Sequence, residues 1–215
     1  MSELGIEPAA IPSDALEGGV PETNFSLFAA FRVSSSHPVV LDGRDVPGIV
    51  RELEDVSREI DDEGVLVRGW YDVSGVRSDS DVLVWLQGVA PEDLQWSLRQ
   101  LRRTALVQPL IRSWSALGVV VDAPDGDDAP KQWLSVSGAT ERPTFADAPN
   151  AVSIQAAAAC GLGDAEWIVT HEADELAWIV DHLRDAGGTA DSSSAHGPTL
   201  AGRLIDPAEM VEVLQ

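Results

Sequence analysis

The chain has 215 residues, of which 44% are hydrophobic, so it holds enough apolar material for one large or two small packed domains. Its 36 acidic residues against 14 lysines and arginines give a formal net charge of -22, which would repel the phosphates of nucleic acid and the anionic surface of a membrane. The single cysteine, Cys160, excludes an internal disulfide and a cysteine-based zinc cage. Neither a membrane span nor a signal-peptide pattern is present, so we expect a cytoplasmic protein.

Strand and helix patterns alternate through the first half of the chain. Residues 1–22 are acidic and rich in proline, glycine and alanine, and we interpret them as a disordered tail. Period-2 alternation and a polar turn around the 68–75 segment predict a β-hairpin. In order, the predicted elements are a strand over 24–36, an amphipathic helix over 45–62, hairpin strands at 65–67 and 81–87, a helix over 91–110 that begins at Pro91, and a strand over 113–122.

The second half repeats this pattern without one helix. A linker over 123–131, rich in Asp, Gly and Pro, leads into it. The predicted elements are strands over 132–137, 152–160, 166–172 and 200–205, a helix over 174–185 with Leu176, Ile179, Val180 and Leu183 on one face, and a tail over 207–215. The sequence therefore predicts an α+β fold of two fused β-α-β-β-α-β units, a dimeric ferredoxin-like arrangement with halves at 23–122 and 132–206, the second lacking its first helix.

Several short motifs carry a resemblance to a known family. They are Arg68-Gly-Trp-Tyr-Asp-Val-Ser-Gly-Val-Arg77, Asp81-Val-Leu-Val-Trp85, Leu101-Arg-Arg-Thr-Ala-Leu106, Gly163-Asp-Ala-Glu-Trp167 and Glu172-Ala-Asp-Glu-Leu176. With them the chain resembles the chlorite dismutase-like family, and most closely its actinobacterial coproheme decarboxylases, which finish haem biosynthesis. The resemblance implies a dimeric ferredoxin-like fold assembled as a ring, often a pentamer, with haem bound in the C-terminal half.

The chain departs from the family at the haem pocket. The family's connection between the halves supplies a lysine and, in this branch, a distal histidine, and here 122–130 holds neither. The family positions for a Tyr-Pro pair, an arginine and the redox-active tyrosine correspond to Ser137, Gly138, Glu141 and Pro143. The helix with the proximal histidine is replaced by 144–150, and the single tyrosine, Tyr71, belongs to the hairpin motif. Because an axial ligand, an oxidisable tyrosine and partners for the propionates are lost together, we expect no bound haem and no other cofactor.

Other candidate sites have simpler explanations. The run His171-Glu172-Ala-Asp174-Glu175 is rich in metal-ligand types, but alternation sends His171 and Glu172 to opposite faces, and Asp174 and Glu175 favour a helix N-terminus. His37, His182 and His196 are further candidates for a substitute iron ligand, although none lies in the family's ligand segment. No serine has His and Asp companions at triad-like spacing.

The sequence thus predicts a haem-free and non-catalytic protein, a structural or regulatory subunit that forms a homo-oligomer or assembles with an active coproheme decarboxylase. The alternatives are a coproheme decarboxylase with a rewired haem ligand and a small-molecule binding module that reuses the emptied pocket. Arginine and tryptophan are typical of interface centres, and a basic patch would let subunits of net charge -22 meet. We therefore predict an interface on the 91–110 helix at Trp96, Arg99, Arg102 and Arg103.

Overall fold

The computed structural model describes residues 24–36, 45–122, 129–143, 151–187 and 199–215. Its helices and strands are β1 Phe25–Arg32, α1 Val46–Asp62, β2 Leu66–Asp72, β3 Val82–Gly88, α2 Pro91–Leu101, β4 Ile111–Asp122, β5 Trp133–Ala139, β6 Ser153–Ala158, β7 Trp167–Ala173, α3 Leu176–Gly187, β8 Leu200–Ile205 and α4 Pro207–Val213. This is the predicted order with one helix added at the end. The predicted tail over 1–22, residues 123–128 of the predicted linker, and His37 and His196 lie outside the described residues.

The eight strands of the described part form one closed barrel in the order β1-β3-β2-β8-β5-β7-β6-β4. Each half contributes four neighbouring strands, β4-β1-β3-β2 and β8-β5-β7-β6, and the relative order within the two sets is the same. The predicted hairpin is present, because β2 and β3 pair antiparallel from Leu66 opposite Gln87 to Asp72 opposite Val82. The two sets are joined at both edges by the β2–β8 and β4–β6 pairs, so no sheet edge is left open.

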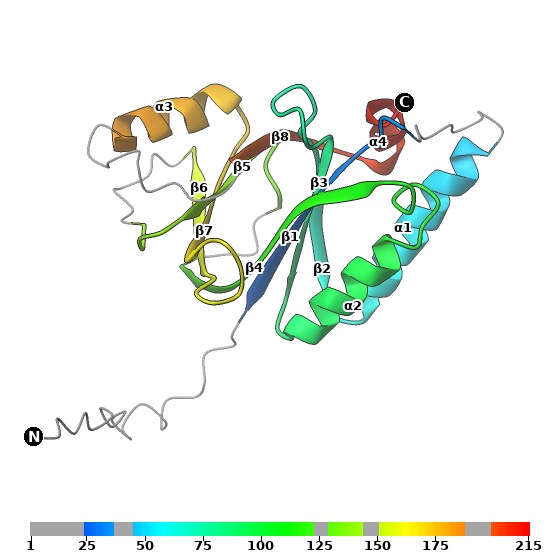
Figure 1. The fold of residues 1–215 in the computed structure, drawn as a ribbon, viewed down its shortest axis with the longest axis horizontal. Helices are drawn as coiled ribbons and strands as arrows, with labels where there is room; N and C mark the ends of the chain where they lie inside the picture. The colour runs from blue at the N-terminus through cyan, green and yellow to red at the C-terminus, as the bar shows by residue number, and fades with distance from the viewer. Residues whose placement is uncertain (1–23, 37–44, 123–128, 144–150, 188–198) are drawn as a thin grey trace, which may run out of the picture.

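Successive side chains on each strand point alternately into and out of the barrel, which separates a core inside the barrel from the apolar packing outside it. On β1, Phe28 and Ala30 point inward and pack with residues such as Trp85 and Leu134. The alternate residues Leu27, Ala29 and Phe31 pack against the helices. Figure 1 shows α1 and α2 together on one side of the strands, with α3 on the other side.

Two glycines lie at the seams between the halves, which are the β2–β8 and β4–β6 strand pairs. A Cβ on Gly202 of β8 would lie 2.5 Å from the Asp72 carbonyl oxygen of β2. A Cβ on Gly118 of β4 would lie 2.9 Å from the Cβ of Ala157 on β6. Both distances are shorter than van der Waals contact, so only glycine lets the backbones approach this closely.

The helix predicted over 91–110 ends at Leu101. Backbone N–H groups of Arg103 and Thr104 donate to carbonyls three residues earlier, and the Thr104 hydroxyl donates to the Leu101 carbonyl at 2.7 Å. These bonds use the last carbonyls of the helix, which would otherwise continue the α-helical pattern. Residues after Leu101 form turns, and their apolar members Leu106, Val107 and Leu110 are buried.

The segment 207–215 was predicted as a tail, and this prediction is wrong because it contains α4. The Asp206 carboxylate accepts a hydrogen bond from the Glu209 N–H at 2.8 Å, and the Glu209 carboxylate accepts one from the Asp206 N–H at 3.3 Å. This reciprocal pair, with proline at the first helical position, is a strong helix start. Met210, Val211 and Leu214 then join the core beneath α1 and β2.

Among the helices that the structure describes, none combines the length and apolar character that a bilayer crossing needs.

Candidate functional site

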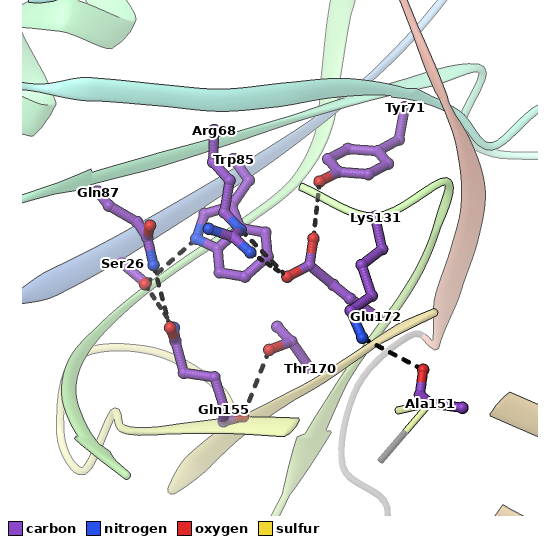
Figure 2. Close-up of polar contacts among 10 residues, drawn as sticks. All are labelled: Ser26, Arg68, Tyr71, Trp85, Gln87, Lys131, Ala151, Gln155, Thr170 and Glu172. Atoms are coloured by element: carbon purple, nitrogen blue, oxygen red, sulfur yellow. Dashed lines mark hydrogen bonds and ion pairs between the residues drawn. The ribbon is translucent and has the colours of Figure 1, made fainter. Parts of the chain in front are cut away.

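A buried ion pair crosses the inside of the barrel between the two halves. Arg68 on β2 donates through Nε at 3.1 Å and Nη2 at 2.5 Å to Oε2 of Glu172 on β7. The side chains are 11% and 3% exposed. The Arg68 guanidinium also lies over the Trp85 ring, 4.8 Å from its centroid, so one face of the cation makes a cation–π contact. Figure 2 shows these groups converging from strands of both halves.

The single tyrosine of the chain belongs to this buried group. Tyr71 is fully buried, and its hydroxyl donates to Oε1 of Glu172 at 3.3 Å (Figure 2). Burial first, and then the charge of Glu172, raises the pKa of Tyr71 well above its usual range. Tyr71 is therefore a protonated phenol that donates to the carboxylate.

Amide and hydroxyl groups make a second set of contacts across the barrel. Gln155 of β6 donates through Nε2 to the Ser26 hydroxyl of β1 at 2.8 Å, and its Oε1 accepts from Gln87 of β3 at 3.0 Å. Trp85 Nε1 donates to the same Ser26 hydroxyl at 3.2 Å. The barrel interior thus contains polar groups that are paired across the two halves, with the ion pair at one position and the amides at another (Figure 2).

These interior groups have the properties of a structural network. The Arg68 cation is neutralised by Glu172, the phenol is protonated, and the Ser26 hydroxyl is bonded to an indole and an amide, neither of which is a base. Nucleophilic catalysis needs a base beside the hydroxyl, and this arrangement does not supply one. Fully paired polar groups inside a barrel instead fix how the two halves fit together.

His171 and Glu172 point to opposite faces of β7, as the alternation predicts. His171 faces outward against α3, where its ring centroid is 5.5 Å from that of His182. Burial first, and then the charge of His182, lowers the pKa of His171 to about 4, so its imidazole is neutral near pH 7. Among the described residues no three His, Cys, Asp or Glu side chains gather closely enough to hold a metal ion.

The positions that correspond to the family's haem pocket lie at and beyond the end of β5. Ser137 is half-buried, Gly138 is buried and Glu141 is exposed. The neighbouring Arg142 places its guanidinium over the Trp167 ring, 5.6 Å from the centroid. Residues 144–150, which the resemblance predicts to take the place of the family's ligand helix, are outside the described part. Haem would require an axial imidazole and cationic partners for its propionates, whereas Ser137, Gly138 and Glu141 supply a hydroxyl, a glycine and a carboxylate, with Arg142 as a cation beside them. These described residues thus include a cation but no imidazole.

Of the four residues predicted as an interface on the 91–110 helix, Trp96 and Arg99 lie in α2, and Arg102 and Arg103 follow its last residue, Leu101. Arg99 and Arg102 share a helix face with Gln95 and line an open hollow of about 400 Å³, together with Arg112. Trp96 and Arg103 are not among the residues that line this hollow. Trp96 is half-buried and packs against the core outside the barrel. Arg103 is exposed and donates to Gln100 Oε1 at 3.2 Å.

The apolar stripe predicted on α3 is largely exposed. Only Ile179 is buried, in a small core with Val152 and Ala173. Leu176, Val180 and Leu183 are between 36% and 43% exposed, and Trp178 is 42% exposed. An amphipathic stripe normally faces a core, but no second helix in the described C-terminal half packs beside α3. In the N-terminal half, α1 and α2 pack against each other.

Sequence reasoning missed the partners inside the barrel. Arg68 and Glu172 are 104 residues apart, so no local spacing links them. The available signal was the charged residue itself: Arg68 stands in the apolar run Leu66–Tyr71, and Glu172 follows Val169 and Thr170 on a strand. A charge on the inward face of a strand requires a partner, although the sequence does not say which one.

The known proteins to which this chain is similar include a coproheme decarboxylase and chlorite dismutases. The chlorite dismutase family model matches residues 47–126, from the start of α1 to just beyond β4. The coproheme decarboxylase of Mycolicibacterium smegmatis (strain ATCC 700084 / mc(2)155) is 29% identical over 222 residues, which cover 84% of this chain and 87% of that protein.

Solved structures with a similar fold come from the same family. The chlorite dismutase of Candidatus Nitrospira defluvii in complex with imidazole has a TM-score of 0.71 at 17% identity, covering 89% of this chain and 95% of that chain. An arginine-to-lysine mutant of the same protein has a TM-score of 0.72 at 16% identity, with 94% of this chain and 100% of that chain covered. At these identities the likeness concerns the fold.

Proposed function

We propose that this chain, which is a chlorite dismutase-like protein, is a haem-free and non-catalytic one that serves as a structural or regulatory subunit. The resemblance predicted from the 68–77 motif is confirmed by the family model and by the similarity to a coproheme decarboxylase. The observation that carries the proposal is the chemistry at the end of β5. Ser137, Gly138 and Glu141 stand where the family has a tyrosine, a proline and an arginine, and a carboxylate there would repel propionates.

The position of the tyrosine supports the same conclusion. The family's decarboxylation uses an oxidisable tyrosine in the haem pocket. The single tyrosine here, Tyr71, lies on β2 of the other half, inside the barrel, and donates to Glu172. Moving it to the pocket would require the barrel to open, so a tyrosyl radical at the end of β5 has no source in this chain.

We also infer that the two halves are equivalent β-α-β-β-α-β units, of which the second has lost its first helix. The shared strand orders β4-β1-β3-β2 and β8-β5-β7-β6 support the equivalence. The positions of α2 and α3, each followed by the last strand of its half, support it as well. In the first unit α1 and α2 pack against each other over the strands, whereas in the described part of the second unit α3 has no such partner and stays partly exposed.

The exposed side of α3 supports a role in assembly. Leu176, Val180 and Leu183 recur at helical spacing, and a stripe that would be core in the N-terminal half faces solvent here. Such a stripe can pair with its own copy about a two-fold axis. An active coproheme decarboxylase paralogue is the other partner that the proposal allows.

One observation favours a second candidate, a coproheme decarboxylase with a substitute iron ligand. His171 carries a neutral imidazole on the outward face of β7, in the half where the family binds haem. A neutral imidazole is the form that binds iron. His171 is only 6% exposed and packs against His182, so iron could reach it only if α3 moved away.

Titration with coproheme tests the proposal against this alternative. We expect the purified protein to be colourless and to show no saturable shift of the Soret band, because Ser137, Gly138 and Glu141 supply no imidazole for the iron and place a carboxylate where propionates would bind. The matched variants are His171→Ala and His182→Ala, which should behave like the wild type. Saturation at one coproheme per chain that His171→Ala abolishes would instead establish the substitute ligand.

Sedimentation velocity tests the assembly. The wild type, at tens of micromolar alone or with an active paralogue, is expected to sediment as an oligomer, and Leu176→Gln with Val180→Gln should shift it toward the monomer with unchanged circular dichroism. The α2 prediction is tested separately with Arg103→Glu, because truncating Trp96 would also disturb the core. If Arg103→Glu dissociates the oligomer and the α3 variant does not, the interface lies on α2. A wild type that is monomeric under both conditions contradicts the assembly proposal.

A further inference from the structure

Three arginines surround one hollow on the N-terminal half of the molecule. Arg99 and Arg102 come from the last turn of α2 and the residue after it, and Arg112 comes from the start of β4. The hollow has a volume of about 400 Å³ and is open to solvent, and all three arginines are exposed. We call it the arginine hollow. Its size is within the usual range for small-molecule sites.

The three guanidinium groups have no carboxylate partner in the described part of the chain. The ion pairs found there involve other arginines, such as Arg58, Arg77 and Arg203. None of the residues that line the hollow is acidic, although the chain contains 36 acidic residues. Arginine near a helix C-terminus favours the helix dipole, which accounts for Arg99 and Arg102. It does not account for Arg112, which is on a strand.

The rest of the lining is mainly apolar. Leucine and alanine side chains of α2 and β4 line it beside the arginines, with the polar Gln95 and Ser115 among them. Leu162, in the turn between β6 and β7, is 54% exposed and also borders it. An exposed leucine at a turn tip costs free energy in water unless something covers it. The hollow therefore combines cationic groups with an apolar surface.

We propose that the arginine hollow binds an amphipathic anion, a small molecule with at least one phosphate or carboxylate group attached to an apolar body. Guanidinium groups bind either head group with paired, charge-assisted hydrogen bonds. The apolar body would cover Leu162 and its neighbours, so that both parts of the hollow are used. This inference does not depend on the absence of haem or on the assembly, since its three arginines lie on α2, just after α2 and on β4, and not on α3 or at the end of β5.

The net charge of -22 does not prevent such binding. At about 0.1 M salt the Debye length is about 10 Å, so acidic residues farther than that from the hollow are screened. The three arginines would be in direct contact with the anion and are screened much less. Local charge thus determines the affinity for a small ligand, whereas the whole-protein charge mainly slows its approach.

Isothermal titration calorimetry with naphthyl phosphate tests the proposal. We expect one saturable site per chain, and we expect Arg102→Glu with Arg112→Glu to weaken binding about tenfold or more, because two charge-assisted contacts become repulsions. The matched control is Arg103→Glu, an equal change of charge per residue in the turn just after α2 but outside the hollow. It should change the affinity by less than about twofold. Circular dichroism should be native for every variant, because the substituted side chains are exposed.

Further ligands separate the contributions of head group and apolar body. Naphthoate in place of naphthyl phosphate distinguishes a carboxylate head from a phosphate head, and saturable binding of either supports the proposal. Pyrophosphate, which has no apolar body, should bind more weakly, and Leu162→Ser should weaken naphthyl phosphate but not pyrophosphate. The proposal is overturned if neither aryl anion saturates, if Arg103→Glu weakens binding as much as the hollow variant, or if Leu162→Ser has no effect on the aryl ligands.

Discussion

Replacing Arg68 by methionine is expected to lower the free energy of unfolding by about 3–5 kcal/mol, because it leaves the Glu172 carboxylate buried without its cation. Glu172 is 3% exposed, and its remaining contact is the 3.3 Å hydrogen bond from Tyr71. Methionine fills much of the volume of the arginine stem, so loss of packing contributes little. Urea unfolding followed by circular dichroism measures the change. Tryptophan fluorescence is less suitable, because Arg68 lies over Trp85.

Two further variants determine whether the loss comes from the uncompensated charge. Arg68→Met with Glu172→Gln removes both charges and keeps an acceptor for Tyr71, so it should recover most of the stability. Arg77→Met is the matched control, since the ion pair of Arg77 with Asp79 is 35% and 53% exposed. Exposed pairs contribute about 0–1 kcal/mol. If Arg68→Met costs no more than Arg77→Met, the buried pair does not hold the halves together.

Hydrophobic periodicity, together with the residues that start and end helices and turns, was sufficient to predict most elements of the fold. Alternating runs placed the β2–β3 hairpin, and the apolar face of the 45–62 segment predicted α1, which ends before a glycine in the left-handed region, Gly64 at φ 83°. The 206–209 segment carried a detectable helix signal as well, with Asp, Pro and Glu at the spacing of a capping box. It was read as a tail because its apolar residues are too few to show a period.

The sequence did not predict which elements pack against each face of a helix or strand. The stripe on α3 correctly indicated an amphipathic helix, but a stripe has the same pattern whether or not another element covers it. Likewise Arg99 and Arg102 were visible in the sequence, whereas their meeting with Arg112 in the arginine hollow depends on where β4 lies in the fold. Glu172 was assigned to the face opposite His171, yet its partner is a residue on another strand, 104 positions away. Long-range contacts of this kind leave no trace in local periodicity.

Closure of the barrel leads to the second prediction, Gly202→Ala, which is expected to destabilise the protein by about 1–3 kcal/mol or more. The added Cβ would lie 2.5 Å from the Asp72 carbonyl oxygen and 2.7 Å from Val73 Cγ1, and the first of these atoms is backbone. Since β2 and β8 pair over only three residues, Trp70 to Asp72 opposite Arg203 to Ile205, the seam has little room to adjust. For a chain of this size each kcal/mol corresponds to about 2–4 °C in melting temperature.

Gly163→Ala provides the control, because a Cβ at that position in the β6–β7 turn meets no atom within 4 Å. Its melting temperature should equal or slightly exceed that of the wild type, since alanine restricts the unfolded chain more than glycine does. Hydrogen exchange locates the effect of Gly202→Ala: protection should fall first in β2 and β8, where the halves are joined, and last in the β1–β4 pair, which has the longest register. Uniform loss of protection over all strands would mean that the barrel opens as one unit and that this seam is not its weak point. Equal melting temperatures for the two variants would show that β8 can shift to admit the methyl group, and the close approach of the halves would then not depend on Gly202.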